Sequence, residues 1–131
     1  MVNDPIGDFI IRLKNASMAG RTEVSVPFSK VKYEIAQVLI REGFLASAEK
    51  KGKKINKFLD VAVKYSPEGA PEIRGVKRIS KLGKRVYVKA KEIFPVKFGH
   101  GITVISTPNG LKTDKEARKE KVGGEAMFSI W

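Results

Sequence analysis

In the first half of the chain, apolar residues recur either at helical spacing or in alternation with polar residues. Helical spacing follows Asp4-Pro5, where Asp4 can cap a helix and Pro5 suits its first position, and the pattern stops at Gly20. A second helical pattern starts after Ser29, another capping residue, and stops at Gly43. Alternation predicts strands at residues 22–27, 44–48 and 57–65. The first half is therefore predicted as helix, strand, helix, strand, strand.

The sequence SPEGAP, residues 66–71, is the clearest internal boundary, because two prolines and a glycine cannot continue a helix or a central strand. Beyond it, strand patterns cover residues 72–80, 85–88, 102–107 and 126–131, and short helical patterns cover residues 89–93 and 114–121. We expect an α+β protein of two lobes. These are an N-terminal α-β-α-β-β domain (1–65), a linker (66–71) and a mostly antiparallel β domain with short helices (72–131).

Composition points to a polyanionic partner and argues against cysteine or histidine chemistry. The 131 residues include 26 Lys and Arg against 14 Asp and Glu, a net charge of +12, which favours nucleic acid first and an anionic membrane surface second. With no cysteine and a single histidine, His100, we expect no disulfide, metal cluster or cofactor. No apolar run approaches the roughly 18 residues of a membrane span, and the N-terminus lacks the positive charge of a signal peptide. We therefore expect a cytoplasmic protein.

The positive charge is concentrated between residues 73 and 100. That segment has nine basic residues and one acid, Glu92, so it supplies a net +8 of the total +12. A surface that serves only solubility mixes both signs, so this asymmetry favours nucleic-acid contact over a merely solvated surface. The basic residues are Arg74, Lys77, Arg78, Lys81, Lys84, Arg85, Lys89, Lys91 and Lys97.

Alternation within RVYVKAK places Arg85, Tyr87 and Lys89 on one face of an extended segment and the valines on the other. A tyrosine among cations can stack on an unpaired base or hydrogen-bond a sugar or phosphate. A half-buried aromatic that covers the edge of the core is the equally open alternative. A second cluster, KKGKK at residues 50–54, is expected at a hairpin turn around Gly52, either as a flexible phosphate contact or as an exposed loop.

Ser106 and Thr107 end an apolar strand pattern directly before Pro108-Asn109-Gly110, a strong turn signal. Pro108 fixes one backbone dihedral, and Asn109 and Gly110 are expected to supply positive ones. Hydroxyls on a rigid turn can donate to and accept from base edges and ribose 2′-hydroxyls, while nearby lysines contact phosphates. A well-made turn without a ligand is the equally open alternative.

Thr113 and Glu116 form a capping box, which predicts a short helix that begins at residue 114. Gly123 is expected to take the left-handed conformation that ends this helix. Gly124 then lets the backbone approach a partner or turn tightly into the last strand. Glu125, beside an anionic ligand, is expected either to accept from a base amino group or to orient a neighbouring donor.

Four segments match a family pattern in order and spacing: DPIGDFIIRLKNA, SKVKYEIAQVLIREGF, RISKLGKRVYVKAKEI and the C-terminal GITVISTPNGLKTDKEARKEKVGGEAMFSIW. They cover nearly the whole chain. On these segments the protein resembles bacterial small-subunit ribosomal protein eight, a family that binds 16S ribosomal RNA.

The resemblance implies two α+β domains and a non-enzymatic, structural role in the small (30S) ribosomal subunit. It implies direct, early binding to the central domain of 16S ribosomal RNA, with other small-subunit ribosomal proteins as neighbours. In many bacteria the family also represses its own operon through a messenger RNA that mimics the ribosomal site. From the resemblance and the basic face together, the residues expected to contact RNA are Ser106, Thr107, Asn109, Gly110, Gly123, Gly124, Glu125, Tyr87, Arg85, Lys84, Lys89 and Lys91, with Asn15, Lys30 and Lys32 as secondary contacts.

One position departs from the family pattern. The family loop usually reads Ser-Thr-Ser, then a basic or polar residue and Gly, whereas Pro108 stands at the third place here. Proline removes a hydroxyl and a backbone donor, so any contact made by that residue is lost. Ser106 and Thr107 therefore carry more of the prediction than the loop as a whole.

Two other functional classes fit the sequence less well. An enzyme would show a signature such as GxxxxGK[ST], GxGxxG or a cysteine nucleophile, and none is present. His100, between two glycines, is expected to be a loop residue or to face RNA rather than to act as a general base. A peripheral membrane protein would need a basic amphipathic helix, whereas the most basic segment has the pattern of strand and loop.

Overall fold

The computed structural model describes residues 4–53, 55–95 and 100–131, which form two compact units. The first unit comprises residues 6–74, and the second comprises residues 75–131 together with Asp4 and Pro5. Three α-helices and two antiparallel sheets in the described residues confirm the predicted α+β class. The predicted linker at residues 66–71 is grouped with the first unit, and the predicted domain bounds stay a prediction.

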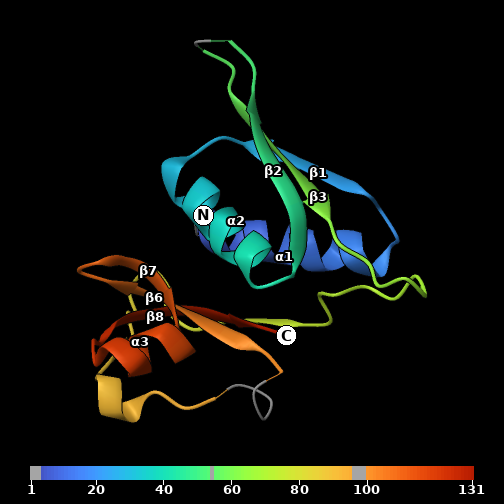
Figure 1. The fold of residues 1–131 in the computed structure, drawn as a ribbon. Helices are drawn as coiled ribbons and strands as arrows, with labels where there is room; N and C mark the ends of the chain where they lie inside the picture. The colour runs from blue at the N-terminus through green and yellow to red at the C-terminus, as the bar shows by residue number, and fades with distance from the viewer. Residues whose placement is uncertain (1–3, 54, 96–99) are drawn as a thin grey trace. The chain divides into compact units, whose positions relative to one another are not determined.

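The first unit has the predicted order of helix, strand, helix, strand, strand. Its elements are α1 (Pro5–Met18), β1 (Glu23–Pro27), α2 (Lys30–Arg41), β2 (Leu45–Lys51) and β3 (Phe58–Val63). The strands form an antiparallel sheet in the order β1-β3-β2, with the helices on one face and the β2–β3 hairpin extending beyond the other elements (Figure 1). Alternate residues of β3, Leu59, Val61 and Val63, are buried, as the sequence pattern predicts.

Local signals explain where the helices of this unit begin and end. The Ser29 hydroxyl caps α2 by accepting a hydrogen bond from a backbone N–H of the first turn, at 3.2 Å. Phe28 and Tyr33 pack across this cap with ring centroids 6.1 Å apart. Gly20 and Gly43 follow the two helices with φ angles of 74° and 85°, in the left-handed region that favours glycine.

Residues 66–71 form a closed turn rather than an extended connection. The Ser66 N–H donates to the Ala70 carbonyl at 2.7 Å, and the Ala70 N–H donates to the Ser66 hydroxyl at 3.1 Å. Tyr65 and Pro71 pair across the turn as an isolated antiparallel bridge. The two prolines and the glycine thus fold the chain back on itself at this point.

The second unit is a five-stranded antiparallel sheet built around its last strand. Its elements are β4 (Val76–Arg78), β5 (Tyr87–Val88), the 3₁₀-helix η1 (Ala90–Glu92), β6 (Ile102–Thr107), β7 (Gly110–Thr113), α3 (Asp114–Glu120) and β8 (Gly124–Ile130). The strand order is β4-β8-β6-β7, and β5 also pairs with β8 (Figure 1). The sequence predicts each of these elements except β7, and β4 and β5 are shorter than predicted.

A bulge sets the register between β6 and β8. Val104 pairs with Phe128, but the next residue, Ile105, pairs with Ala126, which leaves Met127 without a partner on β6. One extra residue on one strand changes which side chains lie opposite each other beyond the bulge. The register of the end of β6 against the start of β8 depends on this bulge.

Candidate nucleic-acid interface

Three of the predicted RNA-contacting residues lie next to one another across three strands. Tyr87 on β5 pairs with Glu125 on β8, and Glu125 also pairs with Ser106 on β6. Residues directly opposed on neighbouring antiparallel strands have Cβ atoms about 4.5–5.5 Å apart on the same face of the sheet. Tyr87, Glu125 and Ser106 are named the central row from here on.

The central row faces away from α3. Each of its members is adjacent in sequence to a residue that lines an apolar hollow on the opposite face: Val88, Ala126 and Ile105. Ile105 also packs in a buried cluster with Ala117 of α3 and with Ile93. Since side chains alternate between the two faces along a strand, the central row occupies the other face.

Glu125 orients a neighbouring cation. Its carboxylate lies 3.1 Å from the guanidinium of Arg85, and the two side chains are 21% and 46% exposed respectively. An exposed ion pair of this kind contributes only about 0–1 kcal/mol to stability, so its main effect is to fix where the guanidinium lies. Of the two roles predicted for Glu125, the structure shows the orienting one.

Tyr87 is exposed rather than half-buried. Its exposed fraction is 71%, which decides against an aromatic residue that covers the edge of the core. Arg85 and Lys89 on the same face are also exposed, while Val86 and Val88 are partly buried, as the alternation predicts. An exposed tyrosine between cations has the form of a stacking platform for a base.

The two hydroxyls at the end of β6 have different roles. Thr107 is 8% exposed, and its hydroxyl donates to the Gly110 carbonyl at 2.8 Å and accepts from the Asn109 N–H at 3.1 Å. Thr107 therefore closes the β6–β7 turn. The Ser106 hydroxyl makes no hydrogen bond to any described residue, and its side chain is partly exposed. Ser106 is thus the hydroxyl available to a ligand.

Gly123 and Gly124 are needed for close packing between strands. A Cβ on Gly124 would lie within 3.0 Å of the Ser106 carbonyl oxygen, and one on Gly123 within 3.0 Å of the Val88 carbonyl oxygen, separations that real Cβ atoms essentially never show. The prediction that Gly123 is the left-handed residue is wrong. That conformation belongs to Lys121, with φ of 57°, the one non-glycine residue of positive φ among those described.

The β6–β7 turn also differs in detail from the sequence prediction. Gly110 has a φ of 103°, as expected, but Asn109 does not have positive φ. The hydrogen bond from the Asn109 N–H to the Thr107 hydroxyl accompanies this different backbone path. Asn109 and Gly110 are both exposed, beside the end of the central row.

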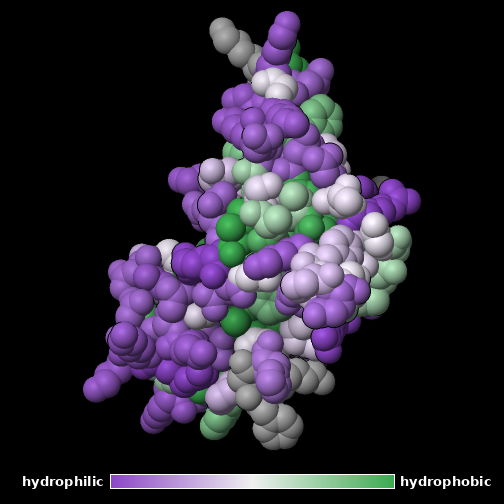
Figure 2. All heavy atoms as spheres, turned by 45° about the vertical axis from the view of Figure 1, so that its right-hand side comes forward, coloured by the Kyte–Doolittle hydropathy of each residue, from purple (hydrophilic) through white to green (hydrophobic). Residues whose placement is uncertain are grey.

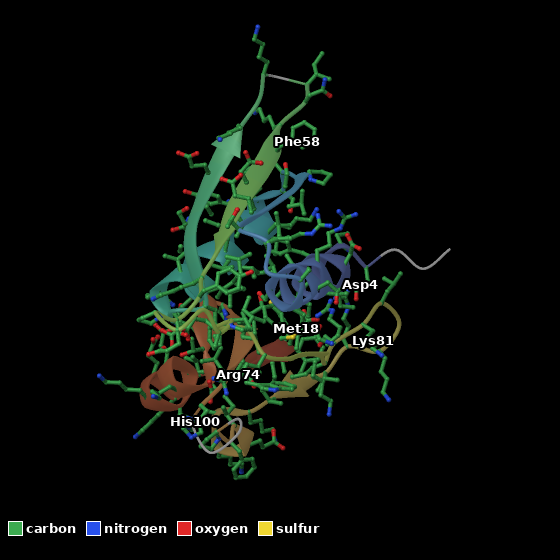
Figure 3. All side chains as sticks on the ribbon, turned by 90° about the vertical axis from the view of Figure 1, so that its right-hand side faces the viewer. Asp4, Met18, Phe58, Arg74, Lys81 and His100 are labelled. Atoms are coloured by element: carbon green, nitrogen blue, oxygen red, sulfur yellow. The ribbon has the colours of Figure 1, made fainter. Side chains whose placement is uncertain are left out.

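Three lysines without an ion pair among the described residues flank Tyr87 along the chain. Lys84, Lys89 and Lys91 are exposed, and none of them forms an ion pair with another described residue. Lys84 exchanges both backbone hydrogen bonds with Lys81, at 3.0 and 2.9 Å, so it lies on a tight hairpin (Lys81 is labelled in Figure 3). The buried Ser80 hydroxyl fixes the following strand by accepting a backbone N–H at 2.9 Å. Hydrophilic residues dominate the surface around α3 in Figure 2.

The predicted secondary contacts Asn15, Lys30 and Lys32 belong to the first unit. Asn15 lines an open pocket of about 400 Å³ together with Arg12 and Arg21. These two cations are not among the predicted contacts. The spacing of Arg12 and Asn15, which places both on one helix face, is a signal that could have indicated Arg12. Lys30 is exposed. Lys32 is 9% exposed, and its ammonium donates to a backbone carbonyl at the end of β1 at 3.2 Å. Lys32 therefore stabilises the start of α2 in this structure, and its contact with RNA stays a prediction.

Two further observations concern metals and membranes. Among the residues that the structure describes, no group of three or more His, Cys, Asp or Glu side chains is placed to hold a metal ion. None of the helices in the described part of the chain is long and apolar enough to cross a membrane. His100 is exposed in a turn.

Comparison with known proteins identifies similar chains over nearly the full length. The family model for Ribosomal protein S8 matches residues 4–131. The small ribosomal subunit protein uS8 of Chloroflexus aurantiacus is 44% identical over 99% of this chain and 98% of its own length. Proteins of the same name from Dictyoglomus thermophilum and Corynebacterium jeikeium are 46% and 43% identical over the same shares. The similarity thus extends across both units, including the strands that hold the central row.

Proposed function

The chain belongs to the Ribosomal protein S8 family, and from this we propose that it is a structural constituent of the small ribosomal subunit that binds the subunit's RNA directly. The family is one of structural ribosomal proteins rather than enzymes. We propose the central domain of 16S ribosomal RNA as the ligand, bound early in assembly, in the cytoplasm. The observation that carries this proposal is the central row with its ion-paired Arg85.

The central row offers three kinds of RNA contact within one patch. Tyr87 presents an exposed aromatic face for stacking, and Ser106 presents a hydroxyl that can both donate and accept. Arg85, held by Glu125, presents several N–H donors in a planar fork that suits phosphate or a guanine edge. Strand pairing fixes the spacing of Tyr87 and Ser106, and the ion pair with Glu125 holds Arg85 beside them. A fixed spacing of contacts favours recognition of one RNA shape over many.

The lysines next to the row suit a different task. Lys84, Lys89 and Lys91 have no described acidic partner, so each can neutralise a phosphate and release counterions. Contacts to phosphates position a protein on RNA but do not read its sequence. We infer a division of labour in which the lysines supply salt-dependent attraction and the central row supplies the register.

We propose two further partners, one from the RNA-binding surface and one from the relatives of the chain. A protein that recognises RNA by shape and base edges binds any RNA that presents the same folded site. We therefore propose that the protein also represses its own operon where that messenger RNA folds into a copy of the ribosomal site. Its relatives are named as small ribosomal subunit proteins, and we propose other proteins of that subunit as its neighbours.

Nuclease footprinting of the pure protein on full-length small-subunit RNA tests the proposed function. We expect protection of one helical element in the central domain, and competition by the leader of the protein's own operon but not by an unrelated structured RNA of equal length. Weak protection spread over the whole RNA, or equal competition by any structured RNA, would contradict site-specific binding.

A further inference from the structure

At the end of the β2–β3 hairpin, the described lysines carry positive charge that no described acid neutralises. The loop between the two strands contains three lysines and no acidic residue. Lys53 and Lys57 are exposed and form no ion pair with any described residue. The two nearby acids, Glu49 and Asp60, both pair instead with Lys51, at 3.5 and 3.3 Å. Among the described residues, the acids of the hairpin therefore neutralise Lys51 on β2 and leave Lys53 and Lys57 without an acidic partner.

Apolar side chains are exposed among these cations. Ile55 is 93% exposed, and Phe58, which Figure 3 shows close to the loop at the start of β3, is 45% exposed. The Lys50 ammonium lies 4.6 Å from the ring centroid of Phe28, so a further cation is held against an aromatic face. In Figure 2 the hairpin is mostly hydrophilic with isolated apolar side chains. Cations combined with exposed apolar and aromatic side chains are typical of surfaces that bind single-stranded nucleic acid.

Local contacts fix the backbone of the described loop residues 52, 53 and 55–57. Gly52 has a φ of 102°, and a Cβ there would lie within 3.0 Å of the Asn56 carbonyl oxygen. The Asn56 N–H donates to the Lys53 carbonyl at 3.0 Å, and the Phe28 N–H donates to the Lys57 carbonyl at 3.0 Å. The described loop residues are thus bonded to one another and anchored to the residue that follows β1. A preshaped loop loses less conformational entropy on binding than a flexible one.

We propose that this hairpin tip, defined as Lys50, Lys53, Ile55, Lys57 and Phe58, is a second RNA contact separate from the central row. The lysines bind phosphates, and Ile55 and Phe58 pack on unpaired bases or riboses. Lysine is depleted at protein–protein interfaces, so its density here favours RNA over a protein partner. This inference rests on the proposed function, because it assigns a further RNA segment to a protein already bound to RNA.

Site-directed crosslinking tests the contact in the assembled particle. The chain has no cysteine, so a single introduced cysteine carries a photo-crosslinker at one known position. Small subunits are reconstituted with full-length Ile55→Cys, with Asn109→Cys as a probe beside the central row, and with Glu68→Cys as an exposed background control. We expect positions 55 and 109 to crosslink to ribosomal RNA at different nucleotides.

The outcomes separate this inference from the proposed function. Crosslinks from position 55 only to protein, or no more RNA crosslinking than from position 68, overturn the hairpin contact. Absence of RNA crosslinks from position 109 contradicts the proposed recognition site, while the result at position 55 still decides the hairpin tip by itself.

Affinity measurements provide an independent readout. The pair Lys53→Ala/Lys57→Ala is compared with Lys64→Ala/Lys119→Ala, which removes the same charge from exposed lysines elsewhere. For full-length small-subunit RNA we expect the first pair to weaken binding roughly 10- to 25-fold more than the second at about 0.1 M salt, because each lost phosphate contact lowers the logarithmic salt slope by about 0.7. Equal effects of the two pairs would overturn the proposed contact.

Discussion

At the scale of single residues, opposite substitutions at Gly124 and Lys121 are expected to change the stability of the second unit in opposite directions. We expect Gly124→Ala to lower the free energy of unfolding by about 1–3 kcal/mol, because the added Cβ meets the Ser106 carbonyl. Lys121→Gly is expected to raise it by about 1 kcal/mol, because Lys121 holds a φ of 57° that glycine adopts without strain. Chemical denaturation measures both changes. A neutral Gly124→Ala variant would show that strand packing does not require this glycine.

Ser106 is the residue on which site discrimination is expected to depend. Ser106→Ala should reduce the preference for the true RNA site over a scrambled stem by about 1–3 kcal/mol, because an RNA polar group loses its partner. Ser47→Ala, at an exposed serine on β2, removes the same hydroxyl elsewhere and should change nothing. Competition gel shifts measure the preference. An equal loss of affinity for both RNAs would contradict a recognition role for Ser106.

Asp60 is expected to titrate below the usual range of a carboxyl group. A hydrogen bond from Ser25 is the largest cause of its lowered pKa, and the Lys51 ammonium at 3.3 Å also contributes. Because the folded pKa lies below the unfolded one, this group stabilises the fold at neutral pH, and the effect disappears as the pH falls through the folded value. In an NMR titration, Ser25→Ala should move the Asp60 midpoint to higher pH. An unchanged midpoint would exclude Ser25 as the main cause.

At the scale of elements, α3 is short and depends on its cap. The Thr113 hydroxyl accepts from the Glu116 N–H at 3.2 Å, and the Glu116 carboxylate accepts from the Thr113 N–H at 3.0 Å. We expect Thr113→Ala to lower the free energy of unfolding by about 1–2 kcal/mol. Thermal or chemical denaturation measures it, with Thr22→Ala as a matched control at an exposed threonine outside any cap. Equal stability of the two variants would contradict the importance of the cap.

Elements that carry their own local signals are the ones that the sequence predicts well. Ser29 and Thr113 mark helix starts because their side chains bond to backbone groups only three residues away. Strand β7 has no alternating pattern of its own, and it forms because the turn after Thr107 brings it against β6. The sequence does not reveal why residue 123 is glycine, because the reason is the close approach of Val88 on β5, which is distant in sequence.

The members of the central row are predictable one at a time, but their alignment is not. Tyr87 stands out as an aromatic residue among cations, Glu125 by its charge and Ser106 by its place before a turn, in three separate segments. Their adjacency follows from the register beyond the bulge in the β6–β8 pairing. If pairing continued regularly from Val104, Ser106 would oppose Ala126 instead. A one-residue difference of this kind depends on tertiary packing rather than on local pattern.

At the scale of the whole molecule, attraction and recognition are expected to respond differently to salt. Lys84→Ala and Lys91→Ala should each reduce the slope of log affinity against log salt by about 0.7 and weaken true and scrambled RNA alike. Ser106→Ala should leave the slope unchanged, because it removes no charge. Filter binding across a salt series measures these slopes. A slope change for Ser106→Ala, or none for the lysine variants, would contradict the division of labour.

The β-bulge at Met127 in β8 limits how strands can be exchanged between homologous proteins. Met127 has no partner on β6. The pairing register with β6 is therefore shifted by one residue between the part of β8 before Met127 and the part after it. A chimaera that takes β8 from another protein keeps Glu125 opposite Ser106 only if donor and host share that insertion. Otherwise every side chain beyond the splice turns to the reverse side of the sheet. Strands β6 and β8 should therefore be transferred together when one homologue is grafted onto another.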